Sequence, residues 1–166
     1  MALAIVYSRA VSGIKAPLVT VEVHLSNGMA GLNIVGLPEK AVKESKDRVR
    51  SALMNAHFEF PIRRITVNLA PADLPKEGGR FDLPIALGIL AASAQIPRSV
   101  LAEYEFVGEL ALSGELRSVR GILPMVLATG EVNRKLIIPH GNANEAALIQ
   151  PIEVLSATMT EILLQM

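Results

Sequence analysis

The feature that most constrains the fold is an apolar run over Leu83–Ile96, with the sequence LPIALGILAASAQI. The run contains Pro84, Ser93 and Gln95, and it is shorter than the roughly 20 apolar residues that a membrane-spanning helix requires. A helix that is apolar on every side is stable in water only when other elements cover it. We therefore expect Leu83–Ile96 to form a buried helix of a globular protein.

The composition favours one compact domain and excludes several classes of protein. Hydrophobic residues make up 51% and charged residues 19%, which excludes disorder, and 166 residues correspond to one domain. The 16 Lys and Arg residues balance 16 Asp and Glu residues, so bulk positive charge does not attract nucleic acid. The chain has no cysteine and no secretory signal at its N-terminus. We expect a cytoplasmic protein with no membrane segment.

The N-terminal half is predicted to contain four strands. Residues 3–9, 18–25 and 31–36 have the alternating, β-branched character of strands, and a turn-forming cluster at 26–28 separates the second from the third. We expect these three strands to form an antiparallel meander. Residues 64–70, RITVNLA, expose few positions and are predicted to form a central strand.

An amphipathic helix is predicted after Pro38, a residue type that favours the first turn of a helix. The positions expected to face the core are Val42, Ser45, Val49, Ala52, Leu53 and Ala56. The opposite face carries opposite charges four residues apart, which favours the ion pairs Glu39/Lys43, Lys40/Glu44, Lys43/Asp47 and Glu44/Arg48.

Strands and helices alternate in the C-terminal half. The predicted elements are a strand at 105–112, a turn at 113–114, a return strand at 115–119, a helix at 122–133, a strand at 136–139, a small helix near 144–149, a strand at 153–156 and a helix from Thr160. This alternation predicts an α/β or α+β fold with a mixed sheet, in which residues 1–166 form a single domain.

The most unusual segment is the loop PADLPKEGGRFD, residues 71–82, between the predicted central strand and the buried helix. Pro75, Gly78 and Gly79 are expected to shape this loop, and Asp82 is expected to be the N-cap of the helix. Helix N-termini are partially positive, and loops in this position commonly hold binding sites. The alternative is a rigid connection with no role beyond capping.

Several familiar motifs are missing from the sequence. No Walker A string, dinucleotide-binding G-x-G-x-x-G or nucleophile elbow G-x-S-x-G occurs. His24, His57 and His140 lack the spacing of metal ligands. We therefore expect neither a metal site nor a cofactor in this chain.

Three blocks, in the same order, resemble the catalytic domain of Lon proteases. They are PKEGGRFDLPIAL at 75–87, GELALSGELRSVRGIL at 108–123 and RKLIIPHGNANEAALI at 134–149. The resemblance implies a fold like the Lon catalytic domain and ribosomal-protein domain 2. It places Arg80 at the position of the nucleophilic serine and Leu123 at that of the lysine base. Because neither replacement can perform that chemistry, we expect no peptidase activity.

Nearly the whole chain resembles the N-terminal domain of the Mg-chelatase-like AAA+ ATPases of the YifB/ComM group. The segments GLPEKAVKES and NLAPADLPKEGGRFDLPIA carry this resemblance. It implies a non-proteolytic accessory domain, followed after residue 166 by a AAA+ module that would bind ATP and Mg. It further implies a parent protein that forms a hexameric ring and drives DNA branch migration in natural transformation and recombination.

Local clusters of basic residues are the candidates for DNA or anion contacts, because phosphate contacts need only local positive charge. The candidates are Lys43, Lys46 and Arg50 on the predicted helix, and Lys76 and Arg80 in the loop. With 4% aromatic residues and no Trp, base stacking is not expected to dominate. Two alternatives remain open: a protein-interaction or oligomerisation domain without DNA affinity, and a Ser/Lys peptidase with a shifted dyad.

Overall fold

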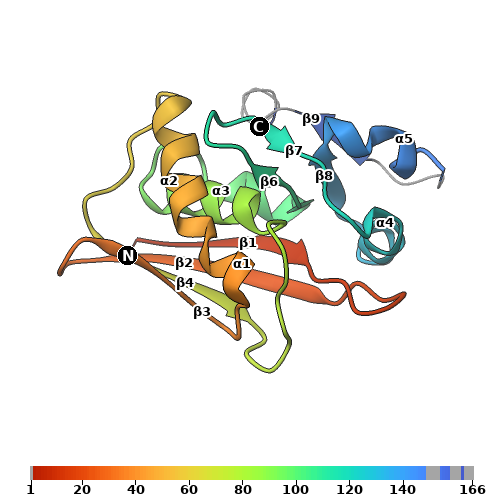
Figure 1. Cartoon of the computed structure of the whole chain (residues 1–166), viewed down its shortest axis with the longest axis horizontal. Helices are drawn as coiled ribbons and strands as arrows, with labels where there is room; N and C mark the ends of the chain where they lie inside the picture. The colour runs from red at the N-terminus through yellow and green to blue at the C-terminus, as the bar shows by residue number, and fades with distance from the viewer. Residues whose placement is uncertain (1, 149–153, 158–161, 163–166) are drawn as a thin grey trace.

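The computed structural model describes residues 2–148, 154–157 and 162, and it has a mixed sheet with helices packed against it (Figure 1). The seven strands of this sheet follow the order β3-β4-β2-β1-β5-β8-β9. Helices α1, α2 and α3 lie together over one face, while α4 and α5 lie beside β8 and β9 (Figure 1). The predicted mixed α/β architecture is therefore confirmed.

The strands of the main sheet are β1 (Leu3–Arg9), β2 (Leu18–Ser26), β3 (Gly31–Val35), β4 (Arg64–Ala70), β5 (Tyr104–Phe106), β8 (Lys135–Pro139) and β9 (Val154–Ala157). A separate antiparallel hairpin consists of β6 (Glu109–Leu110) and β7 (Leu116–Arg117). The helices are α1 (Lys40–Lys43), α2 (Ser45–Asn55), α3 (Asp82–Ala92), α4 (Ile122–Glu131) and α5 (Ala143–Ala146). Short 3-10 helices span Ser99–Glu103 and His140–Asn142.

The third strand does not continue the predicted meander. β1 and β2 are antiparallel, as expected, but β4 lies between β2 and β3, and β3 runs parallel to β4. The reason lies in the side chains: β4 buries Ile65, Val67 and Leu69 completely, whereas β3 buries only Ile34 and suits the edge. α1 and α2 form the crossover that parallel neighbours need.

The predicted buried helix is confirmed as α3, in which every residue from Asp82 to Ala92 is buried. It packs on β1 and β2 at close range. A Cβ atom placed on Gly88 would lie 2.5 Å from the Cγ2 atom of Val23, so this contact requires glycine. In the part of the chain that the structure describes, no helix combines the length and the apolar character needed to cross a membrane.

The amphipathic helix after Pro38 is confirmed with two differences. It begins at Lys40, and Glu44 separates α1 from α2. Its predicted core positions are buried except Ala56, which is half-buried. Of the four predicted ion pairs, the described residues form only that between Glu44 and Arg48, at 3.7 Å. Glu39 instead accepts a hydrogen bond from the backbone of Gly78.

The strand predicted at 105–112 is divided into β5 and β6. Between them, Val107 donates its backbone N–H to the carbonyl oxygen of Ile137, and Gly108 donates to that of Arg80. The chain leaves the main sheet at this point and contacts the start of α3. The return strand is also shorter than predicted, because only Leu116 and Arg117 pair with β6.

The remaining C-terminal predictions agree with the structure wherever it describes them. The expected helix at 122–133 corresponds to α4, and the expected strand at 136–139 corresponds to β8. The small helix near 144–149 corresponds in part to α5, and the strand at 153–156 overlaps β9. The helix predicted from Thr160 lies outside the described residues.

Candidate functional site

A cleft of about 640 Å³ lies where the loop before α3 meets the turn before α4. Its walls come from the end of β1, the loop at 74–80, β6 and residues 118–121. Its charged lining residues are Glu39, Glu77, Arg80, Glu109 and Arg120. We call this feature the Arg80 cleft. Its lining includes Pro75, Glu77, Gly78, Gly79 and Arg80, from the loop that the Lon resemblance aligns with the serine motif, and residues 118–121, which precede Leu123.

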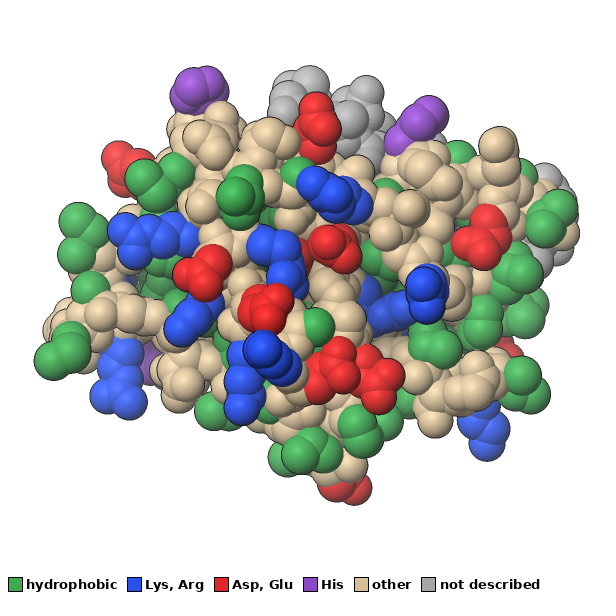
Figure 2. Space-filling view, viewed as in Figure 1, with side chains coloured by type: hydrophobic (Ala, Val, Ile, Leu, Met, Phe, Trp, Pro, Cys, Tyr) green, Lys and Arg blue, Asp and Glu red, His purple; other side chains and the backbone are tan. Residues whose placement is uncertain are grey.

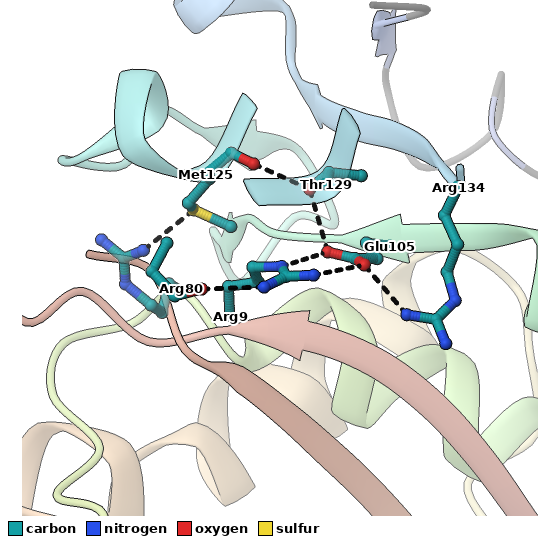
Figure 3. A network of polar contacts seen from close by, with 7 residues as sticks. Arg9, Arg80, Glu105, Met125, Thr129 and Arg134 are labelled. Atoms are coloured by element: carbon teal, nitrogen blue, oxygen red, sulfur yellow. Dashed lines mark hydrogen bonds and ion pairs between the residues drawn. The ribbon is translucent and has the colours of Figure 1, made fainter. Parts of the chain in front are cut away.

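Arg80 is held in a wall of the cleft by two contacts from its guanidinium group. Nη1 donates to the sulfur of Met125 at 3.2 Å (Figure 3), and Nη2 donates to the carbonyl oxygen of Arg120. The residue is only 8% exposed, and burial lowers the pKa of its guanidinium, with Glu77 acting in the opposite direction. A largely desolvated cation therefore lies at the position that the sequence resemblance aligns with the serine of Lon proteases. Leu123, which the resemblance aligns with the lysine of Lon proteases, lies half-buried in the first turn of α4.

Lys76 is completely enclosed, although the sequence suggested a surface contact. Its Nζ atom donates to the carbonyl oxygen of Gly36 at 2.5 Å and to that of Pro71. Burial lowers the pKa of Lys76 from its ordinary value. The ammonium group therefore ties the loop to the end of β3. Because Lys76 is completely buried and two of its three N–H donors bind backbone carbonyls, we leave it out of the proposed DNA contacts.

Gly78 and Gly79 are glycines for different structural reasons. Gly78 has a φ of +75°, a conformation that side chains rarely adopt, and its N–H donates to Glu39 Oε1 at 2.8 Å. Gly79 packs against the side chain of Glu109: a Cβ atom added to Gly79 would lie 2.7 Å from the Cγ atom of Glu109. Pro75 is exposed at the cleft. The loop is thus shaped by these residues, as the sequence indicated for the glycines.

Asp82 is not the N-cap of α3, contrary to the prediction. The N-cap position is Phe81, and no side chain caps the helix. The Asp82 carboxylate instead accepts hydrogen bonds from Ser45 Oγ at 2.5 Å, Arg48 Nε at 2.7 Å and the backbone N–H of Leu110 at 3.0 Å. Burial raises the pKa of Asp82, and the bonds from Arg48 and Ser45 act against that rise.

The basic residues of the predicted helix do lie at the surface. Lys43 and Lys46 are exposed, and both line a shallow groove of about 390 Å³ between β3 and the α1–α2 segment. Glu44 and Asp47 line the same groove, and Figure 2 shows Lys and Arg mixed with Asp and Glu across the visible face. Arg50 is exposed, with its guanidinium 5.6 Å from the centre of the Phe60 ring. The groove beside β3 is therefore lined by side chains of both charges.

A buried network that the sequence analysis missed centres on Glu105 (Figure 3). Its carboxylate accepts two hydrogen bonds from Arg9, one from Nε at 2.6 Å and one from Nη2 at 3.0 Å. It also accepts hydrogen bonds from Thr129 at 2.9 Å and Arg134 at 3.0 Å. The network joins β1, β5 and the C-terminal half of α4. The one signal in the sequence was a glutamate beside the apolar residues of β5.

Fold and cleft together define a mixed α/β domain with a buried arginine in the wall of its cleft, an architecture compatible with the weak similarity to Lon proteases. The family described as subunit ChlI of Mg-chelatase matches residues 21–142. The chain belongs to this Mg-chelatase-like family, in the ComM and YifB group.

Three relatives illustrate the similarity. The competence protein ComM of Haemophilus influenzae is 68% identical over 90% of this chain, and YifB of Escherichia coli is 55% identical over the same share. The chain spans 29% of the length of each of these two relatives. A Lon protease of Leptospira interrogans is 26% identical over 74% of this chain and 15% of its own length.

Proposed function

We propose that this chain is a non-proteolytic accessory domain of a Mg-chelatase-like AAA+ ATPase that acts in competence. The observation that carries the proposal is Arg80, which stands buried in the cleft of a chain similar to ComM over 90% of its length. In the proposed parent protein, a AAA+ module binds ATP and Mg, six copies form a ring in the cytoplasm, and the ring drives DNA branch migration.

The chemistry of the cleft supports the non-proteolytic part of the proposal. Serine attack on a carbonyl requires a base close enough to take the hydroxyl proton. The two serines that line the cleft are Ser12 and Ser118, and both are exposed. Lys15, three residues after Ser12, is exposed and is not among the residues that line the cleft. Lys76, the lysine of the loop at 74–80, donates to backbone carbonyls. An ammonium group used in this way does not serve as a base for either serine.

A peptidase assay tests this part directly. We expect no cleavage of unfolded casein by the purified chain, and the same result for Ser12→Ala and Ser118→Ala variants. Cleavage that disappears in one serine variant and persists in the other would contradict the non-proteolytic assignment and identify a shifted nucleophile.

For DNA, we propose that Lys43 and Lys46 supply phosphate contacts from the groove beside β3. Both lysines are exposed and absent from the ion pairs formed among the described residues. Each phosphate contact is weak alone and depends on salt. A ring repeats the pair in every subunit, which raises the total affinity through multivalency.

The DNA test uses the parent protein in its ring form. A Lys43→Glu/Lys46→Glu double variant is expected to bind a labelled DNA duplex at least about 10-fold more weakly and with a smaller salt dependence. Lys15→Glu, in the exposed loop between β1 and β2, is the matched control and should change little. Unchanged affinity in the double variant would favour the alternative of an interaction or oligomerisation domain without DNA contacts.

A further inference from the structure

Two buried arginines of this chain differ in their partners. Arg9 is 6% exposed and Arg80 is 8% exposed. Arg9 forms a two-pronged ion pair with Glu105. None of the ion pairs formed within residues 2–148, 154–157 and 162 includes Arg80. Its acceptors are the thioether sulfur of Met125 (Figure 3) and the carbonyl oxygen of Arg120. The two sites are similar in burial but not in charge balance.

A buried guanidinium group that lines a cleft and forms no ion pair with a described residue is chemically suited to bind an anion, although Glu77 acts on it at longer range. Burying a charge without a counter-charge is costly, and a hydrogen-bonded anion removes that cost. The guanidinium of Arg80 offers more N–H donors than its two contacts use. Arg80 is one of the residues that line the cleft, so a ligand in the cleft lies next to it. A ligand there would complete the pairing that Glu105 provides for Arg9.

The other charges of the cleft select the kind of anion. Glu39, Glu77 and Glu109 outnumber the arginines Arg80 and Arg120 in the lining. A polyphosphate or nucleic-acid strand would bring several negative charges close to these carboxylates. A single carboxylate brings one negative charge and matches the planar fork of a guanidinium with two parallel hydrogen bonds.

The remaining lining indicates what carries the carboxylate. Ser12 and Ser118 supply hydroxyl groups, while Val11 and Leu74 supply apolar surface. This mixture suits a peptide, which has amide groups and side chains along its length. A volume of about 640 Å³ is within the usual range of ligand sites and exceeds the need of a lone small acid. We propose that the Arg80 cleft binds the C-terminal carboxylate of a peptide chain, with Arg80 as its ionic partner.

The test compares two neutral-bodied probes, the peptide N-acetyl-Ala-Ala-Ala with a free carboxylate and the same peptide as its C-terminal amide. Binding to the wild-type chain is followed by NMR titration or calorimetry. The free carboxylate is expected to bind at least about 10-fold more tightly than the amide, as charge-assisted hydrogen bonds imply. Equal binding of the two probes would overturn the proposal.

Three variants locate the contact. Arg80→Gln should weaken binding of the free carboxylate about 10-fold, and Arg64→Gln, an exposed arginine of β4 outside the cleft, should leave it unchanged. Glu77→Gln removes a like charge from the cleft and should strengthen binding of the carboxylate about 2-fold without affecting the amide. If Arg80→Gln fails to fold, as judged by circular dichroism, the Glu77→Gln result decides: no gain in affinity overturns the proposal.

Two further arms separate the sources of negative charge. Acetate should compete with the peptide only at much higher concentration. Competition by acetate at the same concentration as the peptide would overturn the proposal and indicate that the ligand is a small acid. A short single-stranded oligonucleotide should not displace the peptide. Displacement that depends on Arg80 would overturn the proposal in favour of nucleic acid. These outcomes do not involve Lys43 or Lys46, so they are independent of the DNA test above.

Discussion

The Nε atom of Arg48 lies 2.7 Å from Oδ2 of Asp82, and this pair joins the middle of α2 to the first residue of α3. Asp82 is completely buried, whereas the Arg48 side chain retains 20% exposure. The same carboxylate binds Ser45 and the backbone of Leu110. One side chain thus fixes the positions of α2, α3 and β6 relative to one another.

Replacing Asp82 should therefore destabilise the fold strongly. Asp82→Ala leaves the Arg48 guanidinium and the Leu110 N–H without their acceptor, and we expect a loss of about 3 kcal/mol in the free energy of unfolding. Urea denaturation measures this change. Asp47→Ala, which removes an exposed carboxylate from α2 next to Arg48, is the control and should change stability by less than about 0.5 kcal/mol. Similar losses in both variants would contradict the assigned role.

The Glu105 network leads to a second stability prediction. Glu105→Ala leaves Arg9 buried without a counter-charge and is expected to cost about 3–5 kcal/mol in unfolding free energy. Glu103→Ala, exposed two residues earlier, should have little effect. If thermal melting shows that Arg134→Ala costs as much as Glu105→Ala, the dominant role given to the Arg9–Glu105 pair is wrong.

The contact between α3 and β2 can be tested by a double-mutant cycle. Gly88→Ala places a Cβ atom 2.5 Å from Val23 Cγ2 and should cost about 1–3 kcal/mol through overpacking. Val23→Ala leaves a cavity, which the new methyl group at position 88 would partly fill. We expect the double variant to be more stable than the sum of the single effects by about 1 kcal/mol. Additive effects, measured by denaturation, would show that the helix moves away from the strand instead.

The buried lysine predicts a dependence of stability on pH. The folded state lowers the pKa of Lys76 below its ordinary value of 10.5, so at alkaline pH the unfolded chain binds more protons at this residue. Its contribution to the free energy of unfolding therefore rises as pH increases through the lowered pKa toward 10.5. The stability of the wild-type chain relative to Lys76→Met should increase over this range. A constant difference between the two proteins would contradict the inferred pKa.

Sequence patterns predicted the parts of the fold that depend on neighbouring residues. The apolar run at Leu83–Ile96 required a buried helix, and the residues of 42–53 required a helix with one apolar face. The position of β3 was not predictable in this way, since pairing with β4 depends on which strand best fills the interior. A strand of five residues with one buried side chain carries too weak a pattern to specify its neighbour.

The candidate site was predictable only in part, because its contacts join distant segments. The loop at 71–82 was recognised from its prolines, glycines and charges, and it does line a cleft. The partners of Asp82 and Lys76 lie 34 and 40 residues away in the chain at Arg48 and Gly36. No spacing rule links residues so far apart, so capping and surface exposure were the default expectations for Asp82 and Lys76.

The break between β5 and β6 at Gly108 affects how the Arg80 cleft tolerates amino-acid substitution. Gly108 donates its N–H to the carbonyl of Arg80 and accepts the N–H of Leu83, so the main chain around position 80 is held without help from the side chain at 80. Substitution at this position alters the chemical group offered to a ligand while the surrounding backbone keeps its course. The structural cost of such an exchange falls on the two contacts that the Arg80 side chain makes with Arg120 and Met125.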